Sequence, residues 1–240
     1  MHLRSSYRLE CRGEPRPGVP KGAWIMLCLV LLFLQASPLL GDQLSAILEG
    51  LRKRYGDLPG LVVPYEREIL TRSMALLGEQ TASDRASGKI YFRPPHFLKV
   101  EQERPAEEDL ISDGNTLWWY IPGKKQVYEY PSQKAGKELK VLGDVLQGLR
   151  GVEESFVVML GGRDGAGNLQ LELTPNPPWP EIDHITLYVD QEDNRILKVE
   201  IYNLLGGLTR FKLGDLVVKR QFDPGFFSFV PPEGVRVIKE

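Results

Sequence analysis

Cysteine is nearly absent from this chain of 240 residues, because both cysteines, Cys11 and Cys28, lie within the first 41. From residue 42 onward the protein therefore forms no disulfide and uses no thiol chemistry. Neither cysteine follows the small residues that a lipid-attachment site requires, so we predict no lipidation at either position.

Histidine is also scarce, with only His96 and His184 after residue 41, which leaves too few for a histidine metal site or a catalytic triad. The sequence has no G-x-S-x-G, H-E-x-x-H or P-loop motif. The acidic turn at residues 190–194 resembles half a calcium loop but lacks its glycine and its final glutamate. We therefore predict a protein that is not an enzyme and needs no cofactor or metal.

Charge of one sign does not dominate the chain, since the formal net charge is −2. A basic stripe is typical of nucleic-acid binding, so its absence predicts no nucleic-acid partner. Residues 1–41 hold five basic and two acidic residues, which leaves 25 basic and 30 acidic residues beyond them. A mildly acidic protein of this kind is repelled by anionic lipid head groups, which favours a protein that stays in solution.

The longest apolar run, residues 23–34, is shorter than the roughly 20 residues that a membrane span needs. Its length is typical of a signal peptide, with cleavage after Ala36 or Gly41. We therefore expect a signal peptide with a polar N-terminal extension at residues 1–41 and one domain at residues 42–240. Two alternatives stay open: an uncleaved anchor that extends through Leu40, and a translation start at Val19.

Short extended segments separated by turn residues fill residues 86–131. β-branched and aromatic residues favour strands, while Pro94-Pro95, Asp113-Gly114-Asn115 and Pro122-Gly123 are typical of turns. These segments predict antiparallel hairpins of one sheet. The strands expected here are residues 88–93, 97–101, 110–111, 116–121 and 126–130.

Apolar residues recur at helical spacing in two places. Residues 42–55 predict a helix with Asp42 as its N-cap. Residues 137–150 predict a second helix, in which Gly143 and Gly148 each cost about 1 kcal/mol relative to alanine. We therefore expect the second helix to depend on packing against the sheet.

The rest of the chain returns to extended patterns. Together with the segments above, these predict about eleven strands and two helices in one mainly β (α+β) domain. The expected fold is a strongly curved antiparallel sheet, a half-open β-barrel with helices against its concave side. The further extended segments are residues 60–71 with a continuation over 70–80, then 155–160, 169–173, 184–189, 197–202, 210–218 and 227–230.

Three stretches occur in order along the chain: FRP at residues 92–94 followed by Phe97, SDG-x-TLW at 112–118 followed by Tyr120 and Pro122, and FSFVPPEGV at 227–235. Together they resemble the LolA-like family of periplasmic carriers of outer-membrane lipoproteins. The resemblance implies a monomeric periplasmic chaperone that binds the acyl chains of lipoproteins in an apolar cavity. It would shuttle them from the inner to the outer membrane, with an ATP-driven ABC-type release complex in the inner membrane and an acceptor in the outer membrane as partners.

The resemblance also implies site residues. Arg93 would donate to backbone carbonyls of the lid helix and hold the closed state, a task that suits five donors and a permanent charge. Phe97 matches a position near the cavity mouth. Strand alternation places Leu117 and Trp119 on one face, which we expect to be the concave one. The remaining candidates for the lid and cavity are Tyr91, Leu142, Val145, Leu146 and Leu149.

Alternatives remain for both the residues and the function. Arg93 could be a surface arginine whose stem packs on Tyr91, and each of the other candidate side chains could be ordinary core. The helix at residues 137–150 could be an ordinary core helix instead of a movable lid. A lipid sensor or lipid shuttle of the same half-barrel class is the second functional hypothesis. A structural protein with a filled core is the third.

Overall fold

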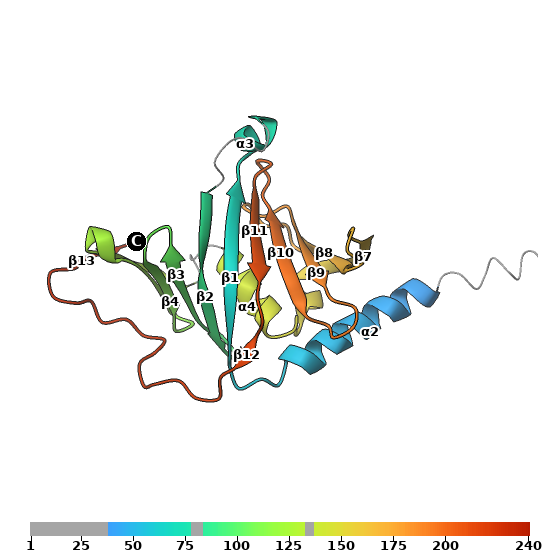
Figure 1. The fold of residues 1–240 in the computed structure, drawn as a ribbon, viewed down its shortest axis with the longest axis horizontal. Helices are drawn as coiled ribbons and strands as arrows, with labels where there is room; N and C mark the ends of the chain where they lie inside the picture. The colour runs from blue at the N-terminus through green and yellow to red at the C-terminus, as the bar shows by residue number, and fades with distance from the viewer. Residues whose placement is uncertain (1–37, 78–83, 133–136) are drawn as a thin grey trace, which may run out of the picture. The chain divides into compact units, whose positions relative to one another are not determined.

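The computed structural model describes residues 38–77, 84–132 and 137–240 (Figure 1). The chain divides into two compact units, Met1–Gly41 and Asp42–Glu240. Most of the predicted signal peptide lies outside the described residues. Within the described ranges, no helix is long and apolar enough to span a membrane.

The described residues form one large sheet of thirteen strands in the order β13-β6-β5-β4-β3-β2-β1-β11-β10-β9-β8-β7, with β12 also paired to β1. Neighbouring strands are antiparallel except β13, which runs parallel to β6. β13 and β7 are the two ends, so the sheet is curved but not closed (Figure 1). The strands are β1 (Leu61–Leu70), β2 (Asp84–Arg93), β3 (Phe97–Arg104), β4 (Glu108–Ser112), β5 (Thr116–Ile121), β6 (Gln126–Pro131), β7 (Phe156–Arg163), β8 (Leu169–Pro175), β9 (His184–Val189), β10 (Ile196–Tyr202), β11 (Leu208–Leu213), β12 (Val217–Val218) and β13 (Arg236–Lys239).

Helices cover one face of this sheet, which we call the inner face; the opposite one is the outer face. The helical elements are α2 (Pro38–Tyr55), α3 (Arg72–Leu77), α4 (Lys137–Leu146) and the 3₁₀ turns η1 (Pro122–Lys124) and η2 (Val152–Glu154). Leu51 of α2 and Leu142 of α4 are buried in one core with Phe92 of β2 and Leu187 of β9. The predicted class, a mainly β protein with a large curved and open antiparallel sheet, is confirmed.

The first helix is longer than predicted, because α2 begins at Pro38 and not after Asp42. Proline fits the first turn of a helix, where its missing N–H would have no partner in any case. Asp42 therefore lies within the helix, and its prediction as the N-cap was wrong. The predicted apolar stripe is confirmed, since Ile47, Leu48 and Leu51 are buried.

The predicted extended continuation over residues 70–80 was wrong. Strand β1 ends at Leu70, and the chain then forms α3, with residues 78–83 outside the described part. The backbone N–H of Met74 donates to Thr71 Oγ1 at 3.3 Å, as expected for a threonine N-cap. Methionine, alanine and leucine are good helix formers, so local propensity favours a short helix here.

Two C-terminal strands also differ from the prediction. Residues 210–218 form two strands, β11 and β12, interrupted at Gly214. Residues 227–230 form no strand: the N–H of Phe226 donates to Asp223 O and that of Ser228 to Gly225 O, which makes consecutive turns. The aromatic rings of this segment pack on the outer face of the sheet instead of forming part of a strand.

Helix α4 ends four residues earlier than predicted, at Leu146. The N–H of Gly148 donates to Val145 O at 3.0 Å and that of Leu149 to Asp144 O at 2.9 Å. With Gly148 at φ +74°, this is a Schellman motif. Gly148 is therefore a helix stop and not a weak point inside the helix; only Gly143 lies within α4.

We expect Gly148→Ala to lower the free energy of unfolding by about 2 kcal/mol, because the left-handed conformation costs other residues about 1–2 kcal/mol. The added Cβ would also lie 2.6 Å from the backbone oxygen of Leu51 in α2. Urea unfolding measures the difference. Gly123→Ala is the matched control, since it has open space around it and should change stability by less than about 1 kcal/mol. Equal stability of the two variants would contradict this role.

Candidate functional site

A cavity of about 300 Å³ lies on the inner face, between α4 and the strands β1, β3, β4, β5, β6 and β11. Most of its lining is apolar or aromatic, as is usual for a site that takes an apolar ligand. A second cavity of about 460 Å³ shares five of its residues: Tyr65, Arg67, Val100, Leu110 and Trp119. The rest of the first cavity is lined by Leu117, Tyr130, Glu138, Leu139, Leu142 and Phe211.

Strand alternation explains why these side chains meet. Leu117 and Trp119 are two residues apart on β5 and therefore point to the same face, which is the inner one. Trp119 is further fixed by its Nε1–H, which donates to Glu108 Oε2 at 2.9 Å, and by the ring of Tyr128 at 5.4 Å. A third cavity of about 280 Å³ shares Leu117 and Leu139 with the first, so hollow space continues beneath α4.

Helix α4 contributes fewer cavity residues than the sequence suggested. Leu142 lines the cavity, and Leu139 was not among the predicted residues but lines it too. Val145, Leu146 and Leu149 are almost completely buried in the core and line none of these cavities. Sequence periodicity cannot separate a core face from a cavity face, since both are apolar.

A hydrogen bond ties the first turn of α4 to the sheet. Thr209 Oγ1 on β11 donates to Glu138 Oε1 at 3.0 Å, and Thr209 is buried. The sequence gave no sign of this pair, whose members are 71 residues apart. It is the kind of contact that a movable helix would have to break.

Arg93, Tyr91 and Phe97 lie on the outer face, away from α4. Arg93 follows Phe92, which points inward, so alternation along β2 turns Arg93 outward. The Arg93 guanidinium carbon lies 4.1 Å from the centre of the Phe97 ring and 5.1 Å from that of Phe227. Among the described residues Arg93 makes no hydrogen bond to α4, so the structure does not contain the contact with the lid that the resemblance implies.

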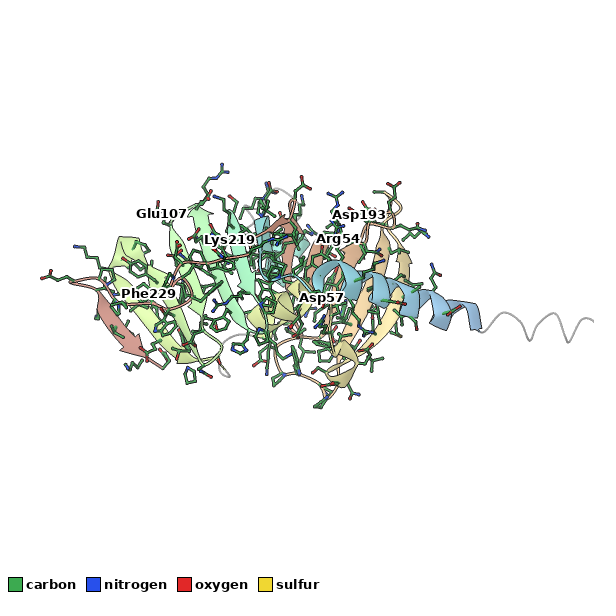
Figure 2. All side chains as sticks on the ribbon, turned by 90° about the horizontal axis from the view of Figure 1, so that it is seen from below. Arg54, Asp57, Glu107, Asp193, Lys219 and Phe229 are labelled. Carbon is green, nitrogen blue, oxygen red and sulfur yellow. The ribbon has the colours of Figure 1, made fainter. Side chains whose placement is uncertain are left out.

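The C-terminal segment that follows β12 covers this outer face. Phe226 packs against Tyr91 with ring centres 5.0 Å apart, and Phe229 against Tyr120 at 4.9 Å. Figure 2 shows Phe229 toward the opposite end of the sheet from Arg54 and Asp193. We predicted only a strand at residues 227–230, and no sequence signal indicated the ring cluster that Phe222, Phe226 and Phe227 form.

A buried carboxylate lies on the outer face at Glu200 of β10, which is 2% exposed. Arg210 Nε donates to it at 2.7 Å, Tyr202 Oη at 2.8 Å and Tyr188 Oη at 2.9 Å. Burial opposes ionisation of Glu200, but these hydrogen bonds outweigh it and lower its pKa. Burial, and then the bond to Glu200, raise the pKa of Tyr188 to about 12. None of its members lines the inner-face cavities of about 300 and 460 Å³, while Arg210 lines a cavity of about 600 Å³ together with Glu68 and Arg85.

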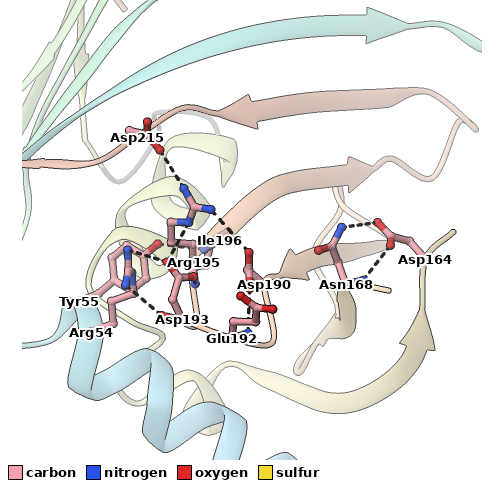
Figure 3. Close-up of polar contacts among 10 residues, drawn as sticks. All are labelled: Arg54, Tyr55, Asp164, Asn168, Asp190, Glu192, Asp193, Arg195, Ile196 and Asp215. Atoms are coloured by element: carbon pink, nitrogen blue, oxygen red, sulfur yellow. Dashed lines mark hydrogen bonds and ion pairs between the residues drawn. The ribbon is translucent and has the colours of Figure 1, made fainter. Parts of the chain in front are cut away.

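The acidic turn between β9 and β10 is organised around an arginine and not around a metal ion. Arg195 lies 3.0 Å from Asp193, 2.8 Å from Asp215 and 3.6 Å from Asp190 (Figure 3). Arg54 of α2 donates to the backbone oxygen of Asp193 at 2.9 Å. The described residues contain no group of side chains that could hold a metal. This turn fastens α2 to the sheet.

An open β-sheet with an apolar cavity beneath a helix has the architecture of a protein that binds apolar ligands. Residues 75–230 match the family described as outer membrane lipoprotein carrier protein LolA, and the chain belongs to this family.

Curated relatives carry the same description. One from Alkalilimnicola ehrlichii, named outer-membrane lipoprotein carrier protein, is 27% identical over 229 residues, covering 91% of this chain and 95% of the relative. Another of that name, from Nitrosospira multiformis, is 30% identical and covers 65% of this chain and 73% of the relative. A solved LolA superfamily protein from Nitrosomonas europaea is 15% identical, with a TM-score of 0.43 over 77% of this chain and 97% of that one.

Proposed function

We propose that this protein is a periplasmic carrier that holds the acyl chains of lipoproteins in the inner-face cavities and shuttles them from the inner to the outer membrane. The observation that carries the proposal is the largely apolar cavity of about 300 Å³ beside α4, which shares lining residues with two more polar cavities of about 460 and 280 Å³. Each methylene group buried there contributes about 0.8 kcal/mol. A chain of such groups is thus held strongly while it stays out of water.

Membership of the family supports the destination and partners that we propose. The carrier would receive cargo from an ATP-driven release complex of the inner membrane and pass it to an acceptor in the outer membrane. Residues 1–41 would direct it to the periplasm and be removed. Release requires a partner to open the cavity, and the hydrogen bond from Thr209 to Glu138 is a contact that docking could break.

Purification of the tagged protein from the periplasm, followed by mass spectrometry of what accompanies it, tests this function. We expect N-terminal acylated peptides in about one-to-one amount. Free phospholipid without such peptides would instead indicate a lipid shuttle. Protein that carries neither would show that the inner face is an ordinary core and would overturn the proposal.

A further inference from the structure

Among the described residues, Arg67 is the one arginine that lines the two joined cavities of the inner face. Arg67 lies on β1 opposite Phe211 of β11 and Ala86 of β2. It lines both the cavity of about 300 Å³ and the adjoining one of about 460 Å³. Because Arg67 lies where the two cavities join, an acyl chain that passes from one cavity to the other would lie next to it.

The hydrogen-bonding capacity of Arg67 is largely unused. Its Nε is buried and has no acceptor in the described residues. Its terminal nitrogen reaches Gln102 Oε1 only at 3.4 Å, and no carboxylate of the described residues lies within 4.0 Å of it. A buried donor without a partner destabilises the protein, and more so when it is charged. A ligand that supplies an oxygen to Arg67 would remove this destabilisation.

The charges around Arg67 decide which oxygen fits. Glu138 lines the first cavity, and Asp84 and Glu108 line the second. Glu108 is already bonded to Trp119. Within these two cavities three carboxylates outnumber the one guanidinium, which disfavours a ligand that carries its own negative charge there. The basic side chains of Arg85, Arg104, Arg210 and Lys212 line a different cavity, of about 600 Å³, which Arg67 also reaches and to which Glu66 and Glu68 contribute as well. A neutral carbonyl oxygen, which accepts a hydrogen bond without adding charge, satisfies Arg67 at no such cost.

We propose that Arg67 binds the carbonyl oxygen of the ester or amide bond that joins an acyl chain to its head group. The cavity then distinguishes neutral, carbonyl-linked chains from free fatty-acid anions. This inference rests on the proposed function and adds a specificity-determining residue to it. The hydrocarbon supplies affinity, and Arg67 fixes how deep the linkage sits.

Two probes that differ only at the linkage test the inference on the full domain: monopalmitoylglycerol, with an ester, and hexadecylglycerol, with an ether. A hydrogen bond to a charged donor contributes about 1.5–3 kcal/mol, so we expect the ester to bind at least tenfold more tightly. Arg67→Met keeps an apolar stem and should bind both probes equally. The comparison forms a double-mutant cycle, read by fluorescence competition or calorimetry.

The control variant is Arg220→Met, which removes one positive charge at an exposed position that lines none of the three cavities that Arg67 lines. It should keep the ester preference. Palmitate serves as the anionic probe and should bind more weakly than the ester. Equal binding of ester and ether by the unmodified protein, an ester preference that survives in Arg67→Met, or tightest binding of palmitate would each overturn the inference alone. Failure of all three probes to bind would overturn the carrier proposal and this inference with it.

Discussion

Leu110→Trp is expected to lower the affinity for acyl chains roughly a hundredfold or more while the protein stays folded. Leu110 lies on the inner face of β4, opposite Trp119, and lines both joined cavities. It is only partly buried, so the larger ring has free space to enter and need not displace the core. Loss of contact with only four methylene groups would cost about 3 kcal/mol, which corresponds to roughly a hundredfold in affinity.

Binding of monopalmitoylglycerol and recovery of acylated peptides from the periplasm measure this effect, with thermal unfolding as the test of folding. Leu205→Trp is the matched control, because Leu205 is 81% exposed at the turn between β10 and β11. It makes the same change of residue type away from the cavities and should leave binding intact. Undiminished binding by Leu110→Trp would show that the cargo lies elsewhere.

The general architecture could be predicted because turn residues divide the chain into alternating segments. Asp113-Gly114-Asn115 and Pro122-Gly123 define β5 on both sides, and the structure places β5 between them. Helix and strand ends were less predictable where the deciding interaction is local. The Thr71 cap of α3 and the Gly148 stop of α4 each depend on backbone hydrogen bonds that periodicity does not reveal.

The site was predicted only in part, because a sequence gives the face of each residue but not what covers that face. Alternation correctly separates Leu117 and Trp119 from their neighbours, and the structure then places this pair at the cavity. The same alternation turns Arg93 outward, where Phe227 from far along the chain meets it. The hydrogen bond that joins α4 to the sheet is made by Thr209 and Glu138. Contacts between residues so distant in sequence have no local signal.

The charged residues Arg67 and Glu200 show the same limit. Alternation along β1 places Arg67 on the face of Val63 and Tyr65, and alternation along β10 places Glu200 on the face opposite Val199 and Ile201. Arg67 lacks a full set of acceptors among the described residues, while Glu200 receives three hydrogen bonds on the outer face. The face of each charge thus follows from the sequence, but its hydrogen-bond partners do not.

Glu200→Ala is therefore expected to lower the free energy of unfolding by about 3 kcal/mol, the lower end of the range for breaking a buried ion pair, because Arg210 keeps its second partner Glu68. For a domain of this size the melting temperature should fall by roughly 6–12 °C. The folded pKa of Glu200 lies below its ordinary value. Its stabilising effect is thus complete at neutral pH and is lost as the pH falls through about 4 and below.

Urea unfolding at pH 7 and at pH 3 measures both effects. The difference in the free energy of unfolding between the original protein and Glu200→Ala should be smaller at the lower pH. Glu172→Ala is the control on the same face: Glu172 pairs with Thr186, whose other neighbour is Glu200. Glu172 has no ion pair within 4.0 Å among the described residues, so its removal should change stability by less than about 0.5 kcal/mol. A difference that stays constant with pH would mean that Glu200 stabilises the sheet by packing alone and that its charge contributes nothing.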